Sequence, residues 1–310
     1  MPHHYRRGRA PDSRALEGPG GPGLRDVTLA RTLREVRRQG LIYAGLVPFV
    51  VIALFPIWWM VITAFKQEAD LYRMDVAPFW FHLPPTLEHF TRLFTRTYFT
   101  AQLLNTVQLA VYVVALTTLM AVPAGYALAR LRLPGAENLG IAIFLTYLVP
   151  PIILFIPLAR VVGMLGLFDS WWALVVVYPG FTIPFCTWKM MGYFKTVPLE
   201  VEEAAWLDGC SRIGGLYRIV LPVSRPGVAI SAVFAFSLAM QEYLYAVAYV
   251  APRTEKVVTV GLATALIRGD IFFWGSLMAG ALVVGLPIAL LYSFVLDHFI
   301  EGFTGVGTSQ

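Results

Sequence analysis

Charged residues are scarce in this sequence. Asp, Glu, Lys and Arg make up 14% of its 310 residues, whereas 57% are hydrophobic and the mean hydropathy is +0.66. Water-soluble domains carry roughly 25% charged residues. The composition therefore excludes the two soluble domains that the length alone would suggest, and it predicts that most of the chain lies in lipid.

Cysteine and histidine are also rare. The two cysteines, Cys186 and Cys210, stand in unrelated surroundings, and the five histidines are scattered. The sequence thus predicts neither a disulfide framework nor a metal site, because both need clustered residues at characteristic spacings. The net charge of +5 is too mild to indicate a nucleic-acid partner, and in a membrane protein it is better interpreted as a topology signal.

Motifs of hydrolytic enzymes are missing as well. The sequence has no G-x-x-x-x-G-K-[ST] phosphate-binding motif, and no serine or cysteine has the neighbours that would make it a nucleophile. We therefore expect no catalytic residue and no cofactor on this chain.

Long apolar runs are what the sequence does contain. A helix needs about 20 mostly apolar residues to cross ~30 Å of hydrocarbon, because its backbone groups must be paired internally there. Six segments meet this requirement: residues 41–65, 103–129, 139–159, 170–188, 226–252 and 271–296. The predicted fold class is an all-α polytopic membrane protein with six transmembrane helices, which the prolines inside the spans should kink.

The distribution of Lys and Arg predicts the topology. With a cytoplasmic N-terminus, the inside segments hold 16 of these residues and the outside segments hold eight, an excess that places both termini in the cytoplasm. Residues 1–40 then form a basic cytoplasmic tail, and residues 66–102 form an extracytoplasmic link. Residues 103–298 form the core with five of the spans, and residues 299–310 form a second cytoplasmic tail.

The loop between the fourth and fifth spans, residues 195–225, differs from its surroundings. Several acids follow Pro198, which predicts a helix that begins near Leu199 with acids in its favoured first turns. Gly209 predicts the end of that helix or a turn, and residues 211–220 predict a second amphipathic helix. From physics alone, a docking surface for a soluble protein and a solvated loop are equally compatible with this pattern.

The spacing of residues within this loop favours the first alternative, a docking surface. From Glu203 to Pro222 it reads E-A-A-x₃-G-x₉-I-x-L-P, and it resembles in full the signature of inner-membrane permease subunits of binding-protein-dependent ABC importers. The resemblance extends over about residues 66–301.

Within that family, residues 103–106, 125–131 and 241–243 resemble the carbohydrate branch related to the maltose permease G subunit. That branch usually has Trp-Asn-Glu or Trp-Asn-Asp in the fifth span, whereas this chain has Met240-Gln241-Glu242. The departure weakens any inference about the particular sugar.

The resemblance implies a type I ABC importer permease fold whose cytoplasmic coupling helices dock on an ATPase. Glu203 would pair with a basic group there, Ala204 and Ala205 would allow close approach, and Gly209 would make the turn. The docking residues that it implies are Glu203, Ala204, Ala205, Asp208, Gly209, Ile219, Leu221 and Pro222, of which the last three would fix the return helix.

The resemblance also implies an assembly in the bacterial cytoplasmic (inner) membrane. The expected partners are a second homologous permease subunit, two ATP-binding subunits that use ATP and Mg, an extracytoplasmic solute-binding protein and membrane lipid. Arg253, Glu255 and Lys256 lie in the outside link that contacts the binding protein in the maltose relative, although this link has an ordinary connector as its alternative. The expected cargo is a disaccharide or oligosaccharide of the maltose or trehalose type.

Glu242 is the one acid inside a predicted span, and an ionisable group at that depth must pair, line water or stay protonated. We expect it to face the bundle interior. It either lines a sugar path with Asn105, Gln241, Tyr243 and Tyr245, or it only ties two helices together. A different class of protein, an ion-coupled secondary transporter, would also have kinked spans and a buried acid.

Overall fold

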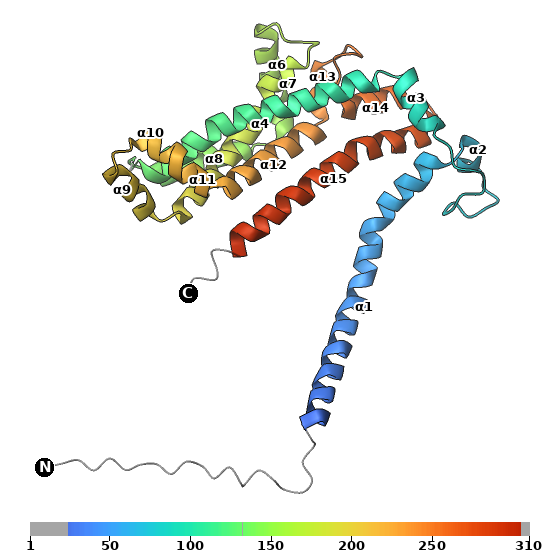
Figure 1. The fold of residues 1–310 in the computed structure, drawn as a ribbon. Coiled ribbons are helices and arrows are strands. Elements are labelled where there is room, and N and C mark those ends of the chain that lie inside the picture. Colours follow the sequence, from blue (N-terminus) through green and yellow to red (C-terminus); the bar gives the residue numbers. More distant parts are fainter. Residues whose placement is uncertain (1–23, 132, 305–310) are drawn as a thin grey trace, which may run out of the picture. The chain divides into compact units, whose positions relative to one another are not determined.

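The computed structural model describes residues 24–131 and 133–304, and it is almost entirely helical (Figure 1). Side chains are described for residues 35, 37–131 and 133–294. Residues 1–23 and 305–310 of the two predicted tails lie outside the described residues. The chain divides into two units, residues 1–58 and 59–310.

The first unit contains most of helix α1, Leu24–Phe65. This helix begins well before residue 41, so the predicted first span continues without a break from the part of the basic tail that is described. From Leu41 to Ile57 its large apolar side chains are exposed, as Phe49 at 72% and Ile52 at 70% show. An apolar surface of this extent needs lipid or a partner around it, as a membrane span requires.

The second unit contains the remaining helices and one short hairpin. The helices are α2 (Glu68–Leu71), α3 (Glu88–Arg96), α4 (Phe99–Arg130), α5 (Ala136–Tyr147), α6 (Pro151–Met164), α7 (Trp172–Val177), α8 (Pro179–Thr196), α9 (Leu199–Leu207), α10 (Arg212–Gly215), the π-helix η2 (Leu216–Val220), α11 (Leu221–Val223), α12 (Arg225–Gln241), α13 (Leu244–Tyr249), α14 (Val258–Leu266) and α15 (Trp274–Thr304). Strands β1 (Ile267–Arg268) and β2 (Ile271–Phe272) pair antiparallel, with Ile267 opposite Phe272.

Helices α4, α8 and α12 lie side by side and form the centre of this unit (Figure 1). Two glycines permit the close approach. A Cβ atom at Gly125 of α4 would lie 2.7 Å from the Cβ of Met190, and one at Gly227 of α12 would lie 2.6 Å from the ring of Tyr193. Thr117 of α4 and Thr182 of α8, both fully buried, also share a hydrogen bond between their hydroxyl groups (2.5 Å). Any larger residue at either glycine would therefore push the helices apart.

Within the described residues, four helices are long and apolar enough to cross a membrane, and they occupy Arg37–Phe65, Phe99–Arg130, Trp172–Thr196 and Trp274–Phe294. Two further pairs pass the same test only together. Helices α5 and α6 meet at 89°, and the segment Arg212–Val223 meets α12 at 80°. The total is six when each bent pair is one span, as predicted.

The structure corrects two of the predicted spans in detail. Residues 139–159 do not form one kinked helix, because Pro150 and Pro151 end α5 and start α6 in a new direction. Residues 226–252 are also interrupted, because α12 ends at Gln241 and α13 begins at Leu244. The second break places the predicted buried acid, Glu242, between two half-helices.

Small residues near the start of α15 allow it to pack tightly. A side chain at Gly275 would collide with the ring of His89, and Ser276 and Ala279 are fully buried. These small residues therefore allow α15 to approach α3 closely.

Candidate functional site

The α8–α12 loop comprises α9, α10, η2 and α11. Its first helix and the turn that ends this helix form where the sequence predicts them. Helix α9 begins at Leu199, directly after Pro198, and ends in a glycine turn. Gly209 has φ +87°, its N–H donates to the carbonyl of Trp206 (3.1 Å), and the N–H of Cys210 donates to the carbonyl of Ala205 (3.0 Å). This pattern satisfies the free carbonyls at the helix end and requires a left-handed residue, for which glycine is suited.

The second helix of the loop is less regular than predicted. Ser211 caps α10 by accepting the N–H of Gly214 at 3.0 Å. The chain then forms η2 in place of a continuous α-helix, and an insertion of this kind often marks a functional position. Between the two helices, the guanidinium of Arg212 lies 5.4 Å from the ring of Trp206, which holds the turn closed.

One face of α9 is exposed. Glu200, Glu203, Ala204 and Leu207 lie on it at helical spacing, and Leu207 is 90% exposed. Asp208 and Gly209 continue this surface, whereas Ala205 is buried beneath it. An exposed leucine between acids on a charged loop is suited to contact with another protein. The signature does not include Leu207. Its position four residues after Glu203, which places both on one face of a helix, could have indicated that Leu207 belongs to this surface.

The opposite face of α9 carries a buried acid, Glu202, which the sequence indicated only as one of several acids in the first turns of this helix. Glu202 is fully buried, and its Oε1 lies 2.6 Å from Nε of Arg130 at the end of α4. Tyr126, also on α4, donates its hydroxyl to the same carboxylate at 2.9 Å. A second guanidinium nitrogen of Arg130 donates to the carbonyl of Val197 at 2.5 Å. These contacts attach α9 to the end of α4 through one buried charge pair.

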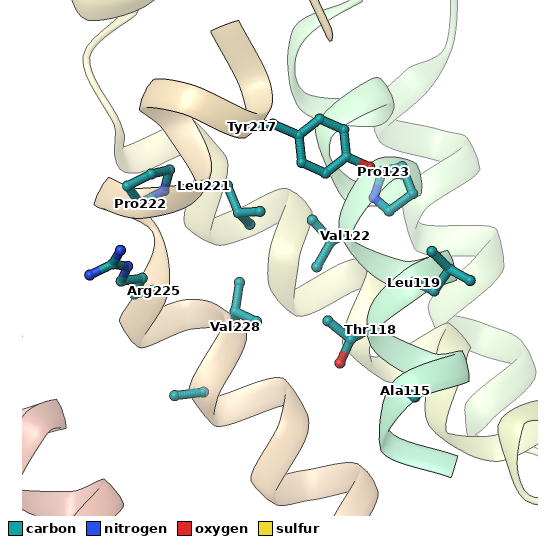
Figure 2. Close-up of a pocket in the computed structure, with 11 residues that line it drawn as sticks. Ala115, Thr118, Leu119, Val122, Pro123, Tyr217, Leu221, Pro222, Arg225 and Val228 are labelled. Carbon is teal, nitrogen blue, oxygen red and sulfur yellow. The ribbon is translucent and has the colours of Figure 1, made fainter. Parts of the chain in front are cut away.

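The return segment of the loop packs against α4 around a cavity of about 830 Å³ (Figure 2). Leu221 and Pro222 line it from one side, and Leu119 and Pro123 of α4 line the other. Ile219 is half-buried nearby. The structure thus places the last residues of the signature beside α4, the helix whose Arg130 and Tyr126 contact Glu202.

Glu242 lies at the break between α12 and α13, where its carboxylate accepts three hydrogen bonds. The N–H groups of Tyr245 (3.0 Å) and Ala246 (3.2 Å) donate to it, and so does the hydroxyl of Tyr178 (2.6 Å). The first N–H groups of a helix have no partner within the helix and carry its positive dipole end. Glu242 therefore caps α13 and ties it to Tyr178, directly before α8.

The other residues predicted along a sugar path are dispersed. Gln241 and Tyr243 are exposed, whereas Tyr245 is buried and its hydroxyl donates to the carbonyl of Pro151 at 2.6 Å. Asn105 lies near the start of α4, and its amide donates to the carbonyls of Thr254 (2.7 Å) and Lys256 (3.2 Å). The structure brings Tyr245 to Glu242 but keeps Asn105 at the link between α13 and α14, and the sugar path remains a prediction.

The residues predicted to contact a binding protein lie between α13 and α14. Arg253 is exposed, and Glu255 and Lys256 are half-buried. Gln102 of α4 donates its amide to the carbonyl of Arg253 at 3.0 Å. The α13–α14 link is therefore fixed to the N-terminal end of α4, where the side chains of the link are available to a partner.

Comparison with known proteins yields one family and a set of curated relatives. The family described as "Binding-protein-dependent transport system inner membrane component" matches residues 121–304. The sulfoquinovosyl glycerol transport system permease protein SmoH of Agrobacterium fabrum is 32% identical over 287 residues, which are 92% of this chain and 96% of that protein. The maltodextrin transport system permease protein MdxG of Bacillus subtilis is 30% identical over 86% of this chain and 94% of its own length.

A solved structure resembles this one as well. It is a chain of a bacterial ABC transporter involved in the import of the acidic polysaccharide alginate, with a TM-score of 0.71 at 22% identity, over 86% of this chain and 98% of that chain. This likeness confirms the predicted type I importer permease fold.

Proposed function

This chain belongs to the family of inner-membrane components of binding-protein-dependent transport systems, and from that membership we propose that it is one of two permease subunits of an ATP-driven carbohydrate importer. It is a multi-pass protein of the inner membrane and a transport component. The names of the similar proteins, which include a maltodextrin and a sulfoquinovosyl glycerol permease, support a carbohydrate as its cargo. No finding supports the ion-coupled alternative.

The attachment of α9 to α4 is the observation that carries this proposal. The exposed face of α9, with Glu203 and Leu207, is available to a partner, while Glu202 on its buried face holds Arg130 of α4. A displacement of α9 is therefore transmitted to a helix that packs along α8 and α12. The ATPase subunits would bind ATP and Mg, and this chain would convert their closure into movement of its spans.

The remaining partners follow from the same arrangement. The α8–α12 loop and both termini would lie in the cytoplasm with the two ATP-binding subunits. The link that contains Arg253 and Lys256 would face an extracytoplasmic solute-binding protein, on which systems of this family depend. A second, homologous permease subunit would complete the path, because one subunit supplies half of it.

Uptake in proteoliposomes tests the proposal. The complex is reconstituted with its co-expressed subunits, and accumulation of labelled sugar is measured with ATP on the cytoplasmic side and again after an ionophore has dissipated ion gradients. We expect uptake that needs ATP and survives the ionophore. Uptake that needs an ion gradient but no ATP would overturn the proposal.

A charge reversal tests the role of α9. Glu203→Lys is expected to keep the assembly inserted but to separate ATP hydrolysis from uptake. Glu137→Lys is the matched control, since Glu137 is an exposed acid on α5 whose ion pair with Lys195, 3.5 Å long, contributes little. Equal uptake in both variants would exclude α9 as the coupling element.

The cargo is tested on the co-expressed solute-binding protein. Its thermal unfolding is measured with maltose, trehalose, a maltodextrin and, as a contrast, an amino acid. Stabilisation by at least one saccharide and by no amino acid supports carbohydrate import, because only a ligand that binds the native state raises the unfolding temperature. Stabilisation by the amino acid alone would contradict it.

A further inference from the structure

A second cavity, which is lined mainly by polar side chains and has a volume of about 480 Å³, lies at the N-terminal end of α4. It is lined by side chains from three separate segments: the α3–α4 junction, the α13–α14 link and the α14–β1 end. Four of these side chains are basic: Arg96, Arg253, Lys256 and Arg268.

The cavity contains positive charge without a compensating acid. No carboxylate lines it, and among the described residues none of the four basic side chains forms an ion pair within 4.0 Å. The ammonium of Lys256 is 3.5 Å from the hydroxyl of Thr264, and Nε of Arg268 donates to the carbonyl of Ala265 at 3.1 Å. Cations gathered in one recess repel one another and raise the positive potential within it.

The cavity wall is built from buried polar contacts. Gln102 lines the cavity, is only 3% exposed, and holds the carbonyl of Arg253 through its amide. The N–H of Val258 donates to the hydroxyl of Thr106 at 2.8 Å, which fixes the far end of the same link. Gly261 leaves room for Gln102, because a Cβ at that position would collide with the amide. The basic segment is thus fixed before any ligand binds, which lowers the entropic cost of binding.

We propose that this cavity binds an oxyanion, namely a sulfate, phosphate, sulfonate or carboxylate group. Guanidinium groups offer paired N–H donors that match two oxygens of such a group, and charge-assisted hydrogen bonds of this kind are the strong ones. The volume accommodates a tetrahedral anion with water or the charged end of a larger molecule. The site lies apart from the α8–α12 loop, and it shares Arg253 and Lys256 with the link that we propose to face the solute-binding protein. Oxyanion binding itself does not require transport of sugar.

Sulfate titration of the purified permease tests this proposal without ATPase or solute. The protein is placed in phosphatidylcholine nanodiscs, and sulfate is titrated by calorimetry at an ionic strength held constant with chloride. We expect saturable binding. Combined Arg96→Gln and Arg268→Gln should weaken it by about tenfold or more, because two charge-assisted contacts are lost. Arg160→Gln, which removes an exposed arginine outside the cavity, should leave it unchanged.

Two further arms make the result decisive. Lys256→Gln should weaken sulfate binding even if the double variant is poorly folded. In phosphatidylglycerol nanodiscs, loss of sulfate binding would identify an anionic lipid headgroup as the resident oxyanion, whereas unchanged binding would identify a free anion; both support the site. Absence of binding in phosphatidylcholine nanodiscs, or an equal loss with Arg160→Gln, would overturn it.

Discussion

The buried pair between Glu202 and Arg130 should govern both the stability of the α8–α12 loop and its coupling to α4. The perturbation is Glu202→Gln, which removes the charge but retains an oxygen that can accept the hydroxyl of Tyr126. Arg130 would then keep its hydrogen bond to Val197 but lose its counter-charge in a site where Glu202 is fully buried.

The expected magnitude follows from the 2.6 Å separation. With an effective dielectric constant of about 20, the attraction of two unit charges at this distance is about 6 kcal/mol, and the desolvation of both groups offsets part of it. Removal of one partner from a buried pair typically costs about 3–5 kcal/mol. Because Gln retains the Tyr126 contact, we expect a loss near the lower limit, about 3 kcal/mol.

A double-mutant cycle separates this interaction from other effects. Unfolding of the purified protein is followed for Glu202→Gln, Arg130→Met and the combined variant, and the same cycle is run on the exposed pair Glu137 and Lys195. We expect a coupling of about 3 kcal/mol for the buried pair and at most about 1 kcal/mol for the exposed one. Additivity of the buried pair within about 0.5 kcal/mol would refute the reasoning.

Three other predictions concern separate parts of the molecule. Gly209→Val places a β-branched residue at φ +87°, a strain of at least about 1–2 kcal/mol, and should abolish ATP-dependent uptake while insertion, measured by protease protection, is retained. Tyr178→Phe leaves Glu242 with one donor fewer and should cost about 1–3 kcal/mol, measured by unfolding, whereas Tyr43→Phe, on the exposed part of α1, should cost almost nothing. Burial raises the pKa of Asp70, but the N–H of His82 and the charge of Lys66 outweigh it and hold that pKa below 3.8. This stabilisation is present above about pH 4 and is lost as the pH falls through the lowered pKa, so Asp70→Asn should lower the melting temperature at pH 7 and progressively less as the pH falls through that pKa; a loss that does not change with pH would refute the ionic role.

Local chemistry made much of the loop predictable. Pro198 at the start of α9 and Gly209 at its end act through backbone geometry that depends on the residue itself, and both positions are confirmed. The six apolar runs were likewise evident, because the membrane imposes a length and a composition on each span.

Tertiary contacts account for what the sequence could not predict. Nothing local distinguishes Glu202 from Glu203, although one is fully buried and the other exposed, because the difference depends on which face of α9 meets Arg130. Proline alone does not identify the bent span, because Pro150 and Pro151 lie at the 89° break between α5 and α6, whereas Pro123 and Pro287 remain inside helices. The basic cavity combines segments more than 150 residues apart, which no periodicity reveals.

The central claim, that a separate ATPase holds the exposed face of α9, is tested most directly by cross-linking. Leu207→Cys, 90% exposed, and the control Met74→Cys, 99% exposed in the link after α1, are each made in a Cys210→Ser background. The reconstituted complex is treated with a short thiol-to-amine reagent. We expect Leu207→Cys to yield a permease–ATPase adduct whose amount changes with ATP, and Met74→Cys to yield none. An unlinked Leu207→Cys, or an equal adduct from Met74→Cys, would contradict the account.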